Sequence, residues 1–231
     1  MAAPAFTPLT AKDWHFGDGA LPERWSLQNS EYALCDAGLM QSPIDLAYPN
    51  ATGNIELETN YGTTSAKLKV GDEKLQLDFP SGMGMMSGDM DFGLLQGHFH
   101  TPSEHAISGK RYPLVGHFVH ATEARRLGVL GVMFEEGAEN PALAEVIEAL
   151  ETGDGAELSL DIMDMMPDDI AVYRYMGSLT TPPCSEGVNW HVAKTPVTAS
   201  AEQIAVISEL LGPSARSIQP RGNRLVVGPS E

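Results

Sequence analysis

The sequence predicts a mainly β fold, with a large, mostly antiparallel, twisted central sheet and a few short peripheral helices. Short runs rich in β-branched and aromatic residues recur between turn signals such as Pro80-Ser81-Gly82 and Gly222-Asn223. Only two segments repeat their apolar residues with a helical period. The 231 residues are 42% hydrophobic and contain no internal repeat or long linker. We therefore expect a single domain over residues 1–231, with an ordered core at about 13–227.

The predicted strands follow one another along the whole chain. Their ranges are 66–77, 94–100, 114–120, 129–134, 172–175, 188–193 and 224–227.

Each of the two predicted helices begins at a capping residue. Asn140 caps the first helix and Pro141 suits its first turn, after which apolar residues at 143, 146, 147 and 150 share one face. Ser200 and Gln203 form a capping-box pattern at the start of the second helix. Gly212, followed by a proline, ends it.

The charge balance limits the partners of the chain. Fourteen Lys and Arg against 31 Asp and Glu give 14 − 31 = −17, which excludes nucleic acid because phosphate binding needs clustered cations. No apolar run approaches the ~20 residues of a membrane span. Residues 1–10 lack the basic start and apolar stretch of a signal peptide, and composition leaves the compartment open.

Five of the seven histidines lie between residues 98 and 120. His98 and His100 are two apart on a predicted strand, so they share a face and form half of a metal site. His117 and His120 are three apart, so only one of them can face the first pair, and parity does not decide which. A lone His-x-His is more often a pair of core or surface histidines. Three histidines without a fourth protein ligand are typical of a catalytic zinc with an open position.

Several segments resemble the alpha carbonic anhydrases, in order and over nearly the whole chain. The segments are 14–17 (Trp-His-Phe-Gly), 41–45 (Gln-Ser-Pro-Ile-Asp), 96–105 (Gln-Gly-His-Phe-His-Thr-Pro-Ser-Glu-His), 116–120 (Gly-His-Phe-Val-His) and 177–184 (Gly-Ser-Leu-Thr-Thr-Pro-Pro-Cys).

The resemblance implies a zinc enzyme that reversibly hydrates carbon dioxide to bicarbonate and a proton by attack of zinc-bound hydroxide. It selects His98, His100 and His117 as the ligands of Zn²⁺. A side activity on activated esters with the same zinc hydroxide is an alternative, as is a non-catalytic family member used for binding or assembly.

The resemblance also assigns the residues around the metal. Thr180 would accept the hydroxide proton and donate its own to Glu104, and Gln96 would orient His98. His105, His120 and His191 are interpreted as structural, hydrogen-bonded histidines. The residues that would contact the substrate, most of them apolar, are Val119, Val129, Leu179, Thr180, Thr181, Val188 and Trp190.

Cys35 and Cys184 occupy positions where secreted bacterial and algal members of the family carry a disulfide. The resemblance therefore implies a periplasmic, luminal or extracellular location. The protein is expected to be a monomer or a homodimer.

Four positions depart from the family pattern. Val115 replaces the glutamate that braces the third ligand, and Phe16 and Gly97 replace other usual residues. Glu73 stands where the proton-shuttle histidine is usual, and an ordinary glutamate accepts a proton poorly from a group with a pKa near 7. We therefore expect a strong dependence on external buffer. His15 could substitute, although a surface histidine without a role is the favoured interpretation.

Overall fold

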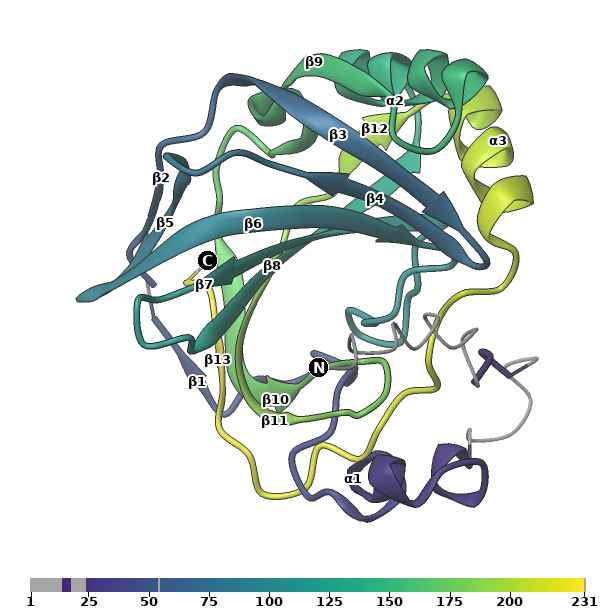
Figure 1. Ribbon diagram of the computed structural model, residues 1–231. Helices are drawn as coiled ribbons and strands as arrows, with labels where there is room; N and C mark the ends of the chain where they lie inside the picture. Colours follow the sequence, from purple (N-terminus) through teal and green to yellow (C-terminus); the bar gives the residue numbers. More distant parts are fainter. Residues whose placement is uncertain (1–13, 18–23, 54, 231) are drawn as a thin grey trace, which may run out of the picture.

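The computed structural model describes residues 14–17, 24–53 and 55–230, and within them thirteen strands form one sheet (Figure 1). The main order is β1-β13-β10-β11-β8-β7-β6-β4-β3-β9, while β12 pairs with β8, and β5 pairs with β2 and β6. The strands are β1 (Ala51–Thr52), β2 (Leu57–Thr59), β3 (Thr63–Gly71), β4 (Lys74–Asp78), β5 (Gly84–Ser87), β6 (Met90–His100), β7 (Leu114–Ala121), β8 (Leu127–Glu136), β9 (Glu157–Asp161), β10 (Val172–Ser178), β11 (Glu186–Ala193), β12 (Val197–Ala199) and β13 (Val226–Gly228).

Most neighbouring strands are antiparallel, as predicted. The parallel pairs among the described residues are β1 with β13, and β8 with both β11 and β12. The fold is therefore a large, predominantly antiparallel mixed sheet.

The predicted strand at 66–77 is wrong in one respect, because the chain reverses within it. β3 ends at Gly71 and β4 starts at Lys74, and the two strands pair antiparallel. The turn between them contains Asp72 and Glu73, and Glu73 has φ of 50°, in the left-handed region. Glycine and aspartate favour turns, and this local signal outweighs the strand pattern around it.

The helices are short, as expected. They are α1 (Ala33–Ala37), α2 (Pro141–Thr152) and α3 (Ala201–Leu211), with 3₁₀ turns η1 (Trp25–Leu27), η2 (Ser30–Tyr32) and η3 (Ile162–Met165). Asn140 caps α2 by accepting from the amide of Leu143, and Ser200 and Gln203 form the predicted capping box at α3. None of the helices in the described ranges is long and apolar enough to span a membrane.

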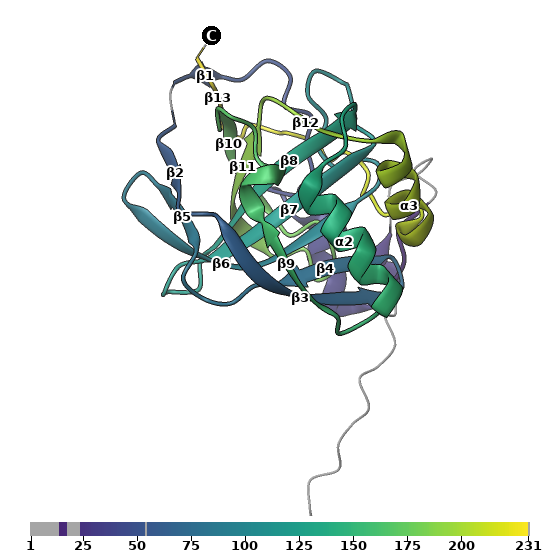
Figure 2. The same ribbon diagram turned by 90° about the horizontal axis from the view of Figure 1, so that it is seen from above.

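The sheet has an apolar core on each face. Helices α2 and α3 lie together on one side of the sheet, as Figures 1 and 2 show, and they contribute to the larger core there. The second core includes Val115, Val119, Val129 and Trp190. Successive side chains of a strand point to opposite faces, so Phe118 of β7 joins the first core and Val119 the second. The histidines discussed next share the face of the second core.

Candidate metal centre

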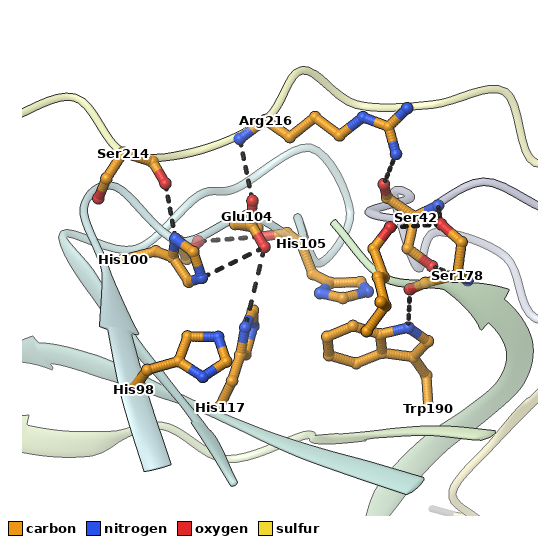
Figure 3. Close-up of polar contacts among 12 residues, drawn as sticks. Ser42, His98, His100, Glu104, His105, His117, Ser178, Trp190, Ser214 and Arg216 are labelled. Carbon is orange, nitrogen blue, oxygen red and sulfur yellow. Dashed lines mark hydrogen bonds and ion pairs between the residues drawn. The ribbon is translucent and has the colours of Figure 1, made fainter. Parts of the chain in front are cut away.

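Strands β6 and β7 bring three histidines together on one face of the sheet. His98 lies directly opposite His117 in the antiparallel register, and His100 follows two residues after His98. One ring nitrogen from each of the three can be chosen so that all lie within 4.8 Å of one another. Figure 3 shows the three rings facing a common point below Glu104.

Hydrogen bonds hold the rings of His98 and His100 in one tautomer each. Nδ1 of His98 donates to the side-chain oxygen of Gln96 at 2.9 Å, and Nδ1 of His100 donates to the backbone oxygen of Ser214 at 2.6 Å. In each ring the proton on Nδ1 leaves the lone pair on Nε2 free to bind a metal. The Gln96 contact is the one that the family resemblance implied.

The ring of His117 is turned the other way. Its Nδ1 lies 3.8 Å from Oε2 of Glu104, the same oxygen that lies 3.7 Å from Nε2 of His100. Its Nε2 is buried and has no hydrogen-bond partner among the described residues. A Cβ atom added to Gly131, which pairs with His117 across β8, would lie 3.8 Å from this Nε2. Nδ1 is therefore the atom that faces the point shared with His98 and His100.

Burial keeps the imidazoles of His98 and His117 neutral. Desolvation is the largest cause that lowers the pKa of His98 and of His117 well below 6.5, and the neighbouring His100 lowers both further. Both are therefore uncharged at neutral pH, so the contact of His117 with Glu104 is not an ion pair. Neutral imidazoles are the form that binds a metal without first losing a proton.

Glu104 is fully buried beside the three histidines, and a segment far along the chain holds it. Its Oε1 accepts a hydrogen bond from the backbone amide of Arg216 at 3.0 Å, while its Oε2 has no hydrogen-bond partner among the described residues. In the described part of the chain no hydrogen bond joins Thr180 to Glu104, and the free oxygen lies near the ring nitrogens of His100 and His117. Thr180 is itself buried.

The loop between β10 and β11 carries Thr180 and Thr181 and is fixed at both ends. At its start Ser178 accepts a hydrogen bond through its backbone oxygen from Nε1 of Trp190 at 2.9 Å. At its far end Cys184 forms a disulfide with Cys35 of α1, which confirms the predicted pairing. These contacts limit the freedom of the loop.

The residues expected to form an apolar wall lie on the same face as His117. Val119, Val129, Val188 and Trp190 belong to one buried cluster, and the half-buried Leu179 packs against it. The Trp190 ring also contacts His117, with the ring centroids 4.9 Å apart. The arrangement places apolar surface next to the histidine cluster.

A cavity of about 240 Å³ opens onto the cluster. Its lining includes Gln96, His98, His100, Thr181 and Glu73. A larger hollow of about 680 Å³ lies over β2, β5 and β6, but no histidine lines it. We therefore take the smaller cavity as the site, because two of the three candidate metal ligands, His98 and His100, line it.

The remaining buried histidines bond to other side chains. Nε2 of His105 contacts the Tyr175 hydroxyl at 2.6 Å, and Nε2 of His120 contacts the Tyr61 hydroxyl at 2.6 Å. Nε2 of His191 similarly contacts the Ser87 hydroxyl at 2.8 Å, in keeping with the structural interpretation of all three.

Two of the departures from the family pattern have visible surroundings. The ring of Phe16 packs edge-on against His100, with centroids 5.9 Å apart. A Cβ atom on Gly97 would lie 3.3 Å from the ring of Phe79 and 3.5 Å from that of Phe118. The space beside Gly97 is thus already filled by aromatic rings.

Comparison with known proteins decides the family. The family described as eukaryotic-type carbonic anhydrase matches residues 20–227. This chain belongs to the alpha carbonic anhydrase family. It is 34% identical to a carbonic anhydrase of Pectobacterium atrosepticum over 93% of this chain and 90% of that protein. It is 35% identical to a carbonic anhydrase of Nostoc over 96% of this chain and 88% of that protein.

A solved structure gives the same result for the fold. A hyperthermostable carbonic anhydrase from an active hydrothermal vent chimney superposes with a TM-score of 0.87 at 34% identity, covering 94% of this chain and all 100% of that one.

The donor set of this alpha carbonic anhydrase fits Zn²⁺. The described residues supply three imidazoles and no fourth ligand to this group, which leaves a position for a small molecule, as in catalytic zinc sites. Nε2 of His100 is buried without a partner among the described residues, which is the state expected of a nitrogen reserved for a metal.

Sequence reasoning missed two contributors, Ser214 and Arg216. Both act through backbone atoms, on His100 and Glu104 respectively, across more than a hundred residues of chain. A backbone contact depends on the path of the chain and leaves no signature in residue type.

Proposed function

We propose that this protein catalyses the reversible hydration of carbon dioxide to bicarbonate and a proton with a zinc ion held by His98, His100 and His117. The observation that carries the proposal is the convergence of three imidazoles, two with their tautomers set by Gln96 and Ser214. A bound zinc would act as a Lewis acid that makes a water nucleophilic near neutral pH.

Glu104 and Thr180 would orient the reacting water. The free, buried Oε2 of Glu104 can accept a hydrogen bond from a hydroxyl group. We infer that the Thr180 hydroxyl, on the loop between β10 and β11, donates to it during turnover and so turns its own lone pairs toward the water. Its backbone amide would then bind a substrate oxygen, with Thr181 alongside.

The apolar wall suits carbon dioxide, which has no net charge or permanent dipole. Val119, Val129, Leu179, Val188 and Trp190 can hold it by contact alone, while the charged product binds this wall less well. Release of bicarbonate is therefore favoured over its retention.

Two rival functions are separable from this one. A non-catalytic binding protein would not need to keep all three metal-ligating histidines. Hydrolysis of activated esters would be a side activity of the same centre, measurable as the ratio of ester to carbon dioxide turnover. The Cys35–Cys184 disulfide supports the proposal that the protein works in a periplasmic, luminal or extracellular compartment.

The ligand assignment is tested by matched histidine variants. His117→Ala should abolish zinc retention and hydration activity, whereas His120→Ala, three residues away on the same strand, should keep zinc. Metal content after gel filtration measures this directly. Loss of zinc in the His120 variant with retention in the His117 variant would reverse the assignment.

A further inference from the structure

His15 lies beside two residues, Asp72 and Glu73, that line the cavity next to His98 and His100. Its Nδ1 is 3.6 Å from Oε2 of Glu73 and 3.5 Å from Oδ2 of Asp72. Glu73 lines the same cavity as His98 and His100. Glu73 therefore connects the imidazole of His15 with the cavity that His98 and His100 line.

The exposure of these side chains falls from the solvent toward the triad. The side chain of His15 is 62% exposed and that of Glu73 is 19% exposed, while His100 is buried. The cavity of about 240 Å³ has room for several waters, each of which occupies ~30 Å³ of liquid. Waters in this cavity can therefore connect the space beside His98 and His100 with Glu73, which contacts His15.

The position of His15 is set by aromatic packing. Its backbone oxygen accepts a hydrogen bond from Nε1 of the buried Trp25 at 2.9 Å. The adjacent Trp14 packs edge-on against Trp25, with ring centroids 5.3 Å apart, and itself lines the cavity. Although exposed, the imidazole is anchored at the cavity mouth.

We propose that His15 is the proton acceptor at the mouth of the active site, with Glu73 between it and the triad. This inference rests on the proposed function, since hydration of carbon dioxide by water yields bicarbonate and one proton per turnover. That proton passes along the cavity waters to the lone pair of the His15 imidazole, forming imidazolium. A base in bulk solution then removes it and restores the neutral ring.

The chemistry favours an imidazole over a carboxylate for this step. An ordinary imidazole has a pKa near 6.5, close to neutral, whereas an ordinary glutamic acid lies near 4.3. Proton acceptors work best when their pKa is near that of the donor and the working pH. The carboxylates of Asp72 and Glu73 lie within ion-pair distance of His15 and would hold its charged ring in place. Lys74, a cation, also lines the cavity.

The test is stopped-flow carbon dioxide hydration by the zinc-loaded protein at saturating substrate and a range of buffer concentrations. His15→Gln should lower kcat at low buffer by about 10- to 100-fold, leave kcat/KM unchanged, and recover with added imidazole. Asp89→Asn, which removes an exposed carboxylate in the turn between β5 and β6 and away from this cavity, is the control and should retain kcat. Glu73→His in the His15→Gln background should recover the lost kcat, because it puts an imidazole back beside the cavity. Histidine suits this position because it tolerates a positive φ better than most residues.

A second readout compares the protein alone with the reaction. The midpoint of the His15 titration, followed by NMR, should coincide with the pH at which kcat at low buffer rises. Unchanged kcat at low buffer in His15→Gln would overturn this inference while leaving the proposed function standing. Absence of hydration by the wild type at every buffer concentration would overturn the proposed function and this inference with it.

Discussion

Val115 lies two residues before His117 on β7, on the same face of the strand, and the buried Nε2 of His117 has no hydrogen-bond partner among the described residues. His98 and His100 each donate a hydrogen bond from the ring nitrogen that points away from the triad, to Gln96 and Ser214. The third imidazole lacks such an acceptor because a valine stands where one could reach it. The triad is therefore braced at two rings and open at the third.

This asymmetry predicts the effect of Val115→Glu. A carboxylate beside Nε2 would accept a hydrogen bond from the Nε2–H, fix the tautomer of His117 and raise its basicity as a ligand. We expect zinc loss to a chelator to slow by about 10- to 100-fold. The measurement is the rate of zinc transfer to a coloured chelator at fixed pH.

Two controls keep this prediction testable. Val115→Ile fills the site without an acceptor and should leave the rate unchanged. Val115→Gln supplies a neutral acceptor and avoids burying a charge, so it should give a smaller slowing even if the glutamate variant folds poorly. Equal rates for the wild type, the folded glutamate variant and the glutamine variant would show that another group braces His117.

The disulfide predicts a large dependence of stability on the two cysteines. Cys35 and Cys184 are 149 residues apart, and a loop of that length restricts the unfolded chain by roughly 5 kcal/mol in the chain-entropy description. Cys35→Ser and Cys184→Ser should each lower the free energy of unfolding by about 2–5 kcal/mol in urea titrations. Finding two reactive thiols per chain in the denatured, unreduced wild type would contradict this pairing.

His120 predicts a loss of stability in mild acid. Burial lowers its pKa to about 4, whereas in the unfolded chain it takes the ordinary value near 6.5. The unfolded state therefore binds the extra proton between these values, so stability falls as the pH drops below 6.5. The contribution of one such histidine is about 2 kcal/mol between pH 7 and pH 5.

Urea unfolding at the two pH values measures this. His120→Gln should lose about that much of the pH dependence. Tyr61→Phe removes the partner hydroxyl but keeps the titrating ring, so it should lower stability at both pH values with the wild-type difference between them. An unaltered pH dependence in His120→Gln would show that His120 does not drive the acid sensitivity.

Local patterns in the sequence predicted most of the elements but not the way they are joined. The caps at Asn140 and Ser200 are short-range signals, and they located α2 and α3 correctly. The strand at 66–77 was read as continuous because the turn at Asp72 and Glu73 is only two residues long. Periodicity alone cannot detect so short a reversal.

The same limit applies to the site. Strand parity showed that His117 and His120 face opposite ways, but only the pairing of β6 with β7 and the contact of His120 with Tyr61 separate their roles. The family resemblance resolved what parity could not. The supporting contacts from Ser214 and Arg216 come from the backbone of a distant segment, which no residue pattern reports.

The most direct measurement of the central claim is carbon dioxide hydration by stopped flow on the purified protein in three states: as isolated, after chelator treatment, and after zinc is added back. If zinc on His98, His100 and His117 carries the reaction, activity should be lost on chelation and return in proportion to zinc, reaching full activity at one ion per chain. Hydration that survives complete removal of the metal, or a fully zinc-loaded protein that does not hydrate carbon dioxide, would contradict it.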